Sequence, residues 1–211
     1  MYDLWRSERL VYRAVEVEDE PFLARIQAQA KSHLNTAPFT PKPLSKEWVK
    51  GTREWLHDKS LIEVVICLPV PAEDAPPSEA VSAAGEKPNP IGHVRLEDMS
   101  PNNAQHRHSE IAISLLEEFQ GKGYGGEAIK WVLRWGFKFC NLHHIAINAF
   151  EWNPGAIRLY QRLGFVKQGV KREFFWFGGR YWDLVMLSML DKEWRELYSK
   201  EETQEMIAGM T

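Results

Sequence analysis

The sequence has little of what marks secreted, membrane-spanning or nucleic-acid-coating proteins. Cysteine occurs only at Cys67 and Cys140, both in apolar runs, so we expect two buried free thiols and no disulfide framework. No run of about 18 apolar residues is present, and we expect no membrane span. The formal net charge of −3 lacks the basic excess of nucleic-acid-binding surfaces, so no nucleic-acid partner is expected.

Several functional signatures are also missing. The first residues carry no apolar signal-peptide stretch, which favours a cytoplasmic location, with access to the nucleus at this modest mass. The Gly-Lys-Ser or Gly-Lys-Thr of a P-loop does not occur. We expect no metal site and surface positions for the scattered histidines, because they lack zinc-site spacing: His93, His106, His108, His143 and His144.

Strand-like and helix-like runs interleave along the 211 residues. Alternating or β-branched runs predict strands at residues 9–15, 61–68, 91–96, 108–116, 145–149, 165–170, 172–177 and 181–190. Gly178-Gly179 predicts a hairpin turn. Helical spacing predicts helices near residues 22–33 and at 46–57, 127–139 and 153–163. The fold class is therefore α/β, or α+β, with a mixed sheet flanked by helices.

Two segments differ from the rest in composition. Residues 69–90 are rich in proline and lack aromatic residues, which predicts a flexible surface insertion between two hairpin strands. A role as a functional lid stays open for this insertion. Residues 191–211 are rich in charge and predict a C-terminal helix or tail.

The most informative stretch lies between a predicted strand and a predicted helix. It comprises Gln120, Gly121, Lys122, Gly123, Tyr124, Gly125 and Gly126. A glycine-rich helix start leaves backbone N–H groups unpaired where the helix dipole adds positive charge, so it can bind a phosphate or diphosphate. Alone, the run is equally compatible with a plain tight turn, and it fits the dinucleotide fingerprint badly.

A second cluster follows one predicted strand later, at residues 153–165. Gln-x-x-Gly-x-Gly after a strand, then a strand, then Asn-x-x-Ala-x-x-x-Tyr-x-x-x-Gly-Phe, resembles the GNAT family of N-acetyltransferases. The variant is similar to the ribosomal-protein N-terminal acetyltransferase-like branch. The resemblance covers about residues 9–190. It implies one acetyltransferase domain over residues 1–211, a mostly antiparallel twisted sheet with a splayed strand pair, and acetyl-CoA as co-substrate.

The resemblance also implies the cofactor contacts. Backbone amides from Gln120 to Gly126 would hold the diphosphate, with Lys122 either adding charge or lying in solvent. Ile113, Ser114 and Leu115, at the end of the splayed strand, would pair with the pantetheine amides. Asn153 and Ala156 would lie beside the same arm, although Asn153 is also explained as a helix N-cap.

Tyr160 is the predicted general acid, which would protonate the CoA thiolate. Helical spacing alone would make Tyr160 a packed side chain; the family motif favours the acid. Glu110 is the first candidate for the base, and Glu63 and Glu97 on neighbouring strands are the others. Ordered water and backbone carbonyls could replace a single base.

The sequence therefore predicts an enzyme that acetylates a primary amine by direct attack on acetyl-CoA. The acceptor is either a small molecule, such as a polyamine, or a protein N-terminus. The protein is expected to be a monomer or a homodimer. A non-catalytic acyl-CoA-binding module on the same fold is the alternative, and an unrelated phosphate-ligand protein is the third reading.

Overall fold

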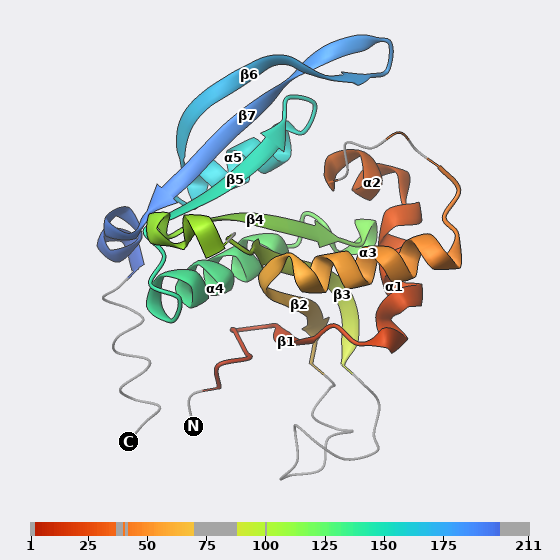
Figure 1. The fold of residues 1–211 in the computed structure, drawn as a ribbon, viewed down its shortest axis with the longest axis horizontal. Helices are drawn as coiled ribbons and strands as arrows, with labels where there is room; N and C mark the ends of the chain where they lie inside the picture. Colours follow the sequence, from red (N-terminus) through yellow and green to blue (C-terminus); the bar gives the residue numbers. More distant parts are fainter. Residues whose placement is uncertain (1–2, 37–39, 41, 70–87, 100, 199–211) are drawn as a thin grey trace.

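The computed structural model describes residues 3–36, 40, 42–69, 88–99 and 101–198. These residues form a seven-stranded sheet of order β1-β2-β3-β4-β5-β7-β6 (Figure 1). The strands are β1 (Val11–Ala14), β2 (Ser60–Leu68), β3 (Asn89–Glu97), β4 (His108–Leu115), β5 (His144–Phe150), β6 (Val166–Phe177) and β7 (Arg180–Leu190). Neighbouring strands are antiparallel except β4 and β5, which run parallel. The predicted mostly antiparallel sheet with flanking helices is confirmed.

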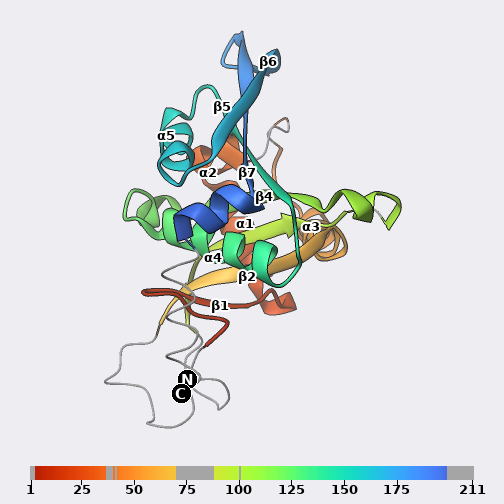
Figure 2. The same cartoon turned by 90° about the vertical axis from the view of Figure 1, so that its left-hand side faces the viewer.

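Helices flank this sheet (Figures 1 and 2). They are α1 (Glu20–Ala28), α2 (Ala30–Thr36), α3 (Lys46–Asp58), α4 (Tyr124–Lys138) and α5 (Pro154–Arg162). Short 3-10 turns lie at η1 (Val17–Asp19), η2 (Pro101–His106) and η3 (Glu117–Phe119). Residues 191–198 are also helical, as expected for the start of the tail, whereas residues 199–211 lie outside the described part.

The alternation of β3 separates the core from the functional face. Leu96 is fully buried in the hydrophobic core that also contains Ile129 of α4. Successive strand side chains point to opposite faces. His93 and Arg95 therefore point away from this core, toward a cavity that side chains of α1 and α3 also line.

Strands β4 and β5 separate soon after they meet. Their pairing joins only residues 108–110 of β4 to residues 144–146 of β5. Beyond this point β4 continues along β3 as far as Leu115, and β5 continues along β7 as far as Phe150. The splayed strand pair is confirmed, and the gap in pairing leaves one edge of the later part of β4 without a strand neighbour.

The β6–β7 hairpin projects beyond the helices at the top of Figure 1. Gly178 and Gly179 have φ angles of 60° and 84°, the left-handed conformation that a tight two-residue turn needs. The predicted turn is confirmed. The strands predicted separately at 165–170 and 172–177 form the single strand β6, whose pairing with β7 is irregular between Lys171 and Phe175.

The proline-rich segment connects β2 and β3, which pair as an antiparallel hairpin. Asn89 and Pro90, assigned to the insertion from the sequence, belong instead to β3, because they pair with β2. Residues 70–87 lie outside the described residues. Of the two thiols, Cys67 is buried as expected, whereas Cys140 is only partly buried. No helix in the described part is long and apolar enough to cross a membrane.

Candidate active site

The glycine-rich run forms a turn that leads directly into α4. Gly121 and Gly123 have φ angles of 74° and 89°, and Gly123 is the N-cap residue. The Glu127 N–H donates to the Gly123 carbonyl at 3.2 Å, which begins the helical hydrogen-bond ladder. The amides of the preceding first turn have no acceptor within the helix. The helix begins at Tyr124, three residues before the predicted start, so its first turn includes two of the glycines.

The side chains of this turn have different environments. Gln120 Nε2 donates to the Leu115 carbonyl at 3.0 Å and to Ser32 Oγ at 3.3 Å, so this side chain ties the turn to β4 and α2. Lys122 is exposed, and its Nζ lies 5.4 Å from the ring centre of Phe119. The backbone N–H of Gln120 donates to the Glu117 carbonyl at 3.2 Å, so both its backbone N–H and its side-chain amide are hydrogen-bonded within the protein. A diphosphate contact by Gln120 stays a prediction.

Arg9 is a neighbour of this turn that the sequence did not reveal. Its backbone N–H and Nε donate to the two carboxylate oxygens of Glu127 at 2.7 and 2.9 Å, and Ser7 Oγ donates to the same carboxylate at 2.6 Å. Arg9 Nη1 also donates to the Lys122 carbonyl at 3.1 Å. The Glu127 charge beside the turn is thus neutralised. The sequence could not reveal this contact, because Arg9 and Glu127 lie 118 residues apart and no local pattern relates such distant positions.

The turn, the end of β4 and α5 meet at one place. A β-carbon added to Gly125 would lie 3.5 Å from the Leu115 side chain and 3.9 Å from that of Leu159 on α5. A β-carbon at Gly126 would lie 3.4 Å from Leu159. These are ordinary van der Waals distances, so a β-carbon would fit at either position and only side chains larger than alanine would press on α5.

Asn153 caps α5. Its Oδ1 accepts a hydrogen bond from the Ala156 N–H at 3.2 Å, and Pro154 occupies the first helical position. The capping interpretation is therefore confirmed. A cofactor contact by Asn153 or Ala156 stays a prediction.

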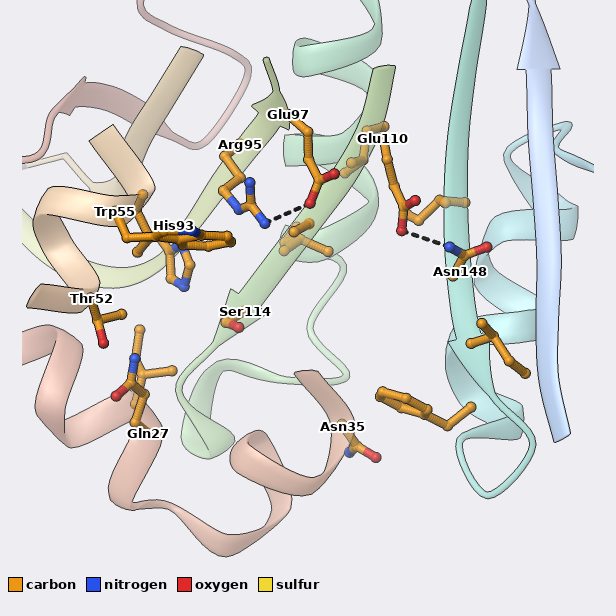
Figure 3. Close-up of a pocket in the computed structure, with 18 of the residues that line it drawn as sticks. Gln27, Asn35, Thr52, Trp55, His93, Arg95, Glu97, Glu110, Ser114 and Asn148 are labelled. Atoms are coloured by element: carbon orange, nitrogen blue, oxygen red, sulfur yellow. Dashed lines mark hydrogen bonds and ion pairs between the residues drawn. The ribbon is translucent and has the colours of Figure 1, made fainter. Parts of the chain in front are cut away.

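A cavity of about 780 Å³ lies between α1–α3 and strands β3, β4, β5 and β7 (Figure 3). Four of the predicted site residues line it: Glu110, Ile113, Ser114 and Tyr160. Apolar walls come from Ile26, Trp48, Phe150, Phe175 and Leu184. The glycine turn does not line the cavity; it lies beyond Leu115, at the other end of the splayed part of β4.

Tyr160 is 8% exposed and packs near Phe165, with ring centres 6.1 Å apart. Burial raises the pKa of its phenol to about 12. The side chain therefore keeps its proton at neutral pH, which a hydrogen-bond donor to a leaving group requires. Its position in the cavity wall is compatible with both the catalytic and the packing interpretation.

Glu110 stands at the last paired position of β4 before the strands separate. Asn148 Nδ2 donates to its Oε1 at 2.6 Å (Figure 3). Burial is the largest cause of a raised pKa for this carboxyl, and the negative charge of Glu97 adds to it, whereas the Asn148 hydrogen bond lowers it. A carboxyl with a raised pKa is a stronger base when ionised.

The other two candidate bases are placed less well. Glu63 is not among the cavity residues, and its side chain is only 6% exposed. Burial raises its pKa to about 7. Glu97 lines the cavity but accepts a hydrogen bond from Arg95 Nη2 at 2.7 Å. Glu110 is thus the carboxylate whose position and environment best fit a base.

Some cavity residues were missed or misplaced from the sequence. His93 was expected at the surface, which is wrong: it lines the cavity, and burial lowers its pKa to about 4. Trp48 and Trp55 belong to the helix predicted at residues 46–57, and they lie 42% and 51% exposed on the cavity wall. Arg95 was not singled out. The alternation of residues 93, 95 and 97 along β3 was the signal that could have found these side chains.

Among the described residues, no group of three or more His, Cys, Asp and Glu side chains is arranged to hold a metal ion. The cavity contains both carboxylate and basic side chains, Glu47, Glu97 and Glu110 with Arg95 and His93. The arrangement can accept an amine near Glu110 and place it beside Tyr160 where two strands part.

A sequence profile described as the acetyltransferase (GNAT) domain matches residues 9–166. The chain therefore belongs to the GNAT acetyltransferase family. The family prediction is confirmed, and with it the enzyme class that the sequence predicted.

Relatives agree with this assignment. The spermidine N(1)-acetyltransferase of Vibrio cholerae is 36% identical over 106 residues, 50% of this chain and 60% of that protein. The Bacillus subtilis protein YdaF, named provisionally as a ribosomal N-acetyltransferase, is 30% identical over 103 residues, 49% of this chain and 55% of that protein. The matches thus span little more than half of each relative.

A solved structure matches over a longer range. The crystal structure of spermidine N-acetyltransferase from Vibrio cholerae in complex with CoA and spermine has a TM-score of 0.70 and 25% identity. The match covers 89% of this chain and 99% of that chain. The overall architecture is therefore shared along nearly the whole described fold.

Proposed function

We propose that the protein is an N-acetyltransferase that moves the acetyl group of acetyl-CoA to a primary amine. The observation that carries this proposal is the cavity, because Glu110 and Tyr160 both line it beside the point where β4 and β5 separate. Family membership and the CoA bound in the Vibrio cholerae neighbour support acetyl-CoA as the co-substrate. The amine acceptor, a cytoplasmic location and a monomeric or homodimeric state stay predictions.

The chain offers one continuous path for the co-substrate. The diphosphate would accept hydrogen bonds from the first-turn amides of α4, where Gly121 and Gly123 keep the backbone open. The pantetheine arm would lie along Ile113 and Ser114, where β4 has lost β5 as a neighbour. The Leu115 carbonyl already accepts from Ser32 and Gln120, so this one group is committed to the protein.

The reaction follows from the two cavity side chains. One proton of the substrate ammonium passes to Glu110, directly or through water, and the neutral nitrogen attacks the thioester carbonyl carbon. The new C–N bond forms, the C–S bond breaks, and CoA leaves as a thiolate. The nitrogen loses its second proton to water, which balances the negative charge of the thiolate. Tyr160 would donate its phenolic O–H to the departing sulfur.

The raised pKa of Tyr160 decides how it would act. An ordinary thiol has a pKa near 8.5, whereas burial raises the pKa of this phenol to about 12. Complete transfer of the phenolic proton to a thiolate is therefore uphill. The effect of Tyr160 would come mainly from a hydrogen bond to the sulfur as negative charge develops there.

The second candidate is a non-catalytic acyl-CoA-binding module. The observation that favours it is the burial of Tyr160 against Phe165, which packing alone explains. The two candidates differ in one outcome, because a binding module is stabilised by acetyl-CoA but produces no acetylated amine.

The test is acetyl-CoA-dependent thiol release against a panel of polyamines, amino acids and N-terminal peptides, with the acetylated product identified by mass spectrometry. We expect release with one acceptor class and a loss of about 10²–10⁴-fold in kcat for Glu110→Gln. Tyr160→Phe should lower kcat with little change in acetyl-CoA affinity. Tyr181→Phe is the matched control, since Tyr181 is 57% exposed near the hairpin turn. Stabilisation by acetyl-CoA with no product from any amine would favour the binding module.

A further inference from the structure

One corner of the cavity contains polar atoms that the protein does not satisfy. Gln27 of α1, His93 and Arg95 of β3 all line the cavity, and Figure 3 shows them on the side formed by α1 and α3. Within the described part of the chain, Gln27 Oε1, His93 Nδ1 and Arg95 Nη1 are buried without a hydrogen-bond partner. His93 Nδ1 lies 3.8 Å from Glu63 Oε1, which is also unpaired and belongs to a residue that does not line the cavity. Buried polar groups are nearly always hydrogen-bonded, so the two remaining atoms, the donor Arg95 Nη1 and the acceptor Gln27 Oε1, point to a polar ligand in the cavity.

Arg95 is the charged member of this corner. Its side chain is only 8% exposed. Nη2 donates to Glu97 Oε1 at 2.7 Å, and the guanidinium carbon lies 5.1 Å from the ring centre of Trp55. Nη1 has no such partner. An unpaired N–H of a buried cation is expensive, and an oxygen with lone pairs is the group that removes this cost.

The neighbours of Arg95 fit the same ligand chemistry. Burial and the charge of Arg95 hold the pKa of His93 at about 4, so the imidazole is neutral at neutral pH and brings no second charge. Trp55 lies over the guanidinium and is half exposed, so its ring covers Arg95 on the cavity wall. An ammonium group cannot accept the hydrogen bond that Arg95 Nη1 has to donate.

The spacing across the sheet relates this corner to the amine site. Arg95 pairs with Ala112 across the β3–β4 ladder, and Glu110 lies two residues from Ala112 on the same face of β4. Such diagonal positions in an antiparallel sheet lie roughly 7–8 Å apart. One small molecule can therefore reach Glu110 with its amine and Arg95 with a second polar group.

We propose that Arg95 forms a second acceptor subsite that binds a carboxylate or amide-carbonyl oxygen of the same molecule whose amine is acetylated, and that Gln27 Oε1 accepts from the N–H of an amide bound there. This proposal rests on the proposed function and deepens it. The acceptor is then a small amino acid or its amide. A polyamine lacks the oxygen that would pair with Arg95 Nη1.

The experiment compares acceptors that differ only at the far end. The panel is 3-aminopropanoate, 4-aminobutanoate and 5-aminopentanoate, each with its amide, its diamine and its simple alkylamine of equal chain length. We expect at least one acid or amide to exceed its diamine and alkylamine by 10-fold or more in kcat/KM. The acid and amide arms distinguish a charged from a neutral oxygen. A diamine or an alkylamine as the best acceptor at every length would overturn the subsite.

Two variants of Arg95 and one control make the test specific. Arg95→Met should lower the ratio of kcat/KM for the acid or amide to kcat/KM for the alkylamine by 10-fold or more. Arg95→Lys should restore part of the preference. Arg53→Met is the control, because Arg53 is partly buried on α3, pairs with Glu20 and does not line the cavity. An unchanged preference in Arg95→Met contradicts the proposal.

Binding measurements keep the proposal testable apart from catalysis. Calorimetry with 4-aminobutanoate and its amide on the CoA-loaded protein should show binding to the parent and a 10-fold or greater loss in Arg95→Met. Such binding without turnover on any amine would contradict the proposed function but support the subsite. The protein could instead turn over alkylamines while the acid and amide bind equally to parent and variant, or bind to neither. That result would support the proposed function but contradict the subsite.

Discussion

Gly123 is the position where one added side chain should act most directly on the co-substrate site. Its φ is 89°, a left-handed conformation that residues with a β-carbon rarely adopt, and it caps α4. A β-carbon there would lie 3.1 Å from Arg9 Nη2. Gly123→Val therefore strains the turn, presses on the arginine that holds the Lys122 carbonyl, and places methyl groups where a diphosphate would approach.

The backbone contribution alone gives a lower limit for the effect. A left-handed conformation disfavours an L-residue by about 1–2 kcal/mol. Since each 1.4 kcal/mol is a factor of ten, strain that shifts the turn away from its binding conformation weakens acetyl-CoA by roughly 5- to 30-fold. Steric exclusion by the methyl groups adds to this value, so we expect binding to fall below detection in a micromolar assay.

The assay is titration calorimetry with acetyl-CoA on parent, Gly123→Val and Gly179→Val. Gly179 is the matched control, because it has nearly the same φ, 84°, in the β6–β7 turn, and a β-carbon there meets nothing within 4 Å. Both variants lose stability through the backbone, but only Gly123→Val should lose affinity. An acetyl-CoA affinity of Gly123→Val equal to that of the control would refute the assignment of this turn to the diphosphate.

Three further predictions concern charge and packing. The pKa of the Glu63 carboxyl is raised from 4.5 to about 7, so its stabilising effect is present below pH 4.5 and is lost as the pH rises through 7. Urea unfolding should show that the free energy of unfolding of Glu63→Gln, relative to that of the parent, increases by about 3 kcal/mol between pH 4.5 and pH 8. Arg9→Ala should weaken acetyl-CoA by exposing the Glu127 charge, and adding Glu127→Gln should restore affinity. Gly92→Ala should lower stability by about 1–3 kcal/mol or more, because its β-carbon would lie 2.4 Å from the Ser114 carbonyl oxygen.

Each of these has a result that contradicts it. Parallel stability–pH curves for parent and Glu63→Gln would show that this carboxyl titrates normally. If the Arg9→Ala and double variants bind acetyl-CoA equally poorly, the loss has another cause than the Glu127 charge. An unchanged melting temperature for Gly92→Ala would mean that β3 and β4 can move apart at this point.

The sequence predicted the elements whose signals are local. The Gly178-Gly179 turn and the Asn153 cap, whose Oδ1 accepts from the Ala156 N–H at 3.2 Å, depend on residues a few positions apart. The start of α4 was misplaced because two glycines, poor helix formers, occupy its first turn.

The cavity could be predicted only in part. Tyr160 came from a motif and Glu110 from its place in the strand before the glycine run, but their meeting in one cavity depends on strand pairing that no local pattern encodes. Trp55 and Arg95 belong to different elements, and their contact follows from how α3 crosses the sheet. The burial of His93 required the register of β3 against β2 and β4, since an isolated histidine in a strand is compatible with either face.

Acetyl transfer in the cavity with Glu110 as the base is tested by single-turnover transfer from 14C-labelled acetyl-CoA to the best amine, in the parent, Glu110→Gln and Tyr181→Phe. We expect label to move to the amine as CoA thiol is released in equal amount. Glu110→Gln should slow this step by at least 100-fold, and Tyr181→Phe should not. Thiol release without labelled amine, or an equal rate in Glu110→Gln, would contradict an acetyl transfer carried out in this cavity with Glu110 as the base.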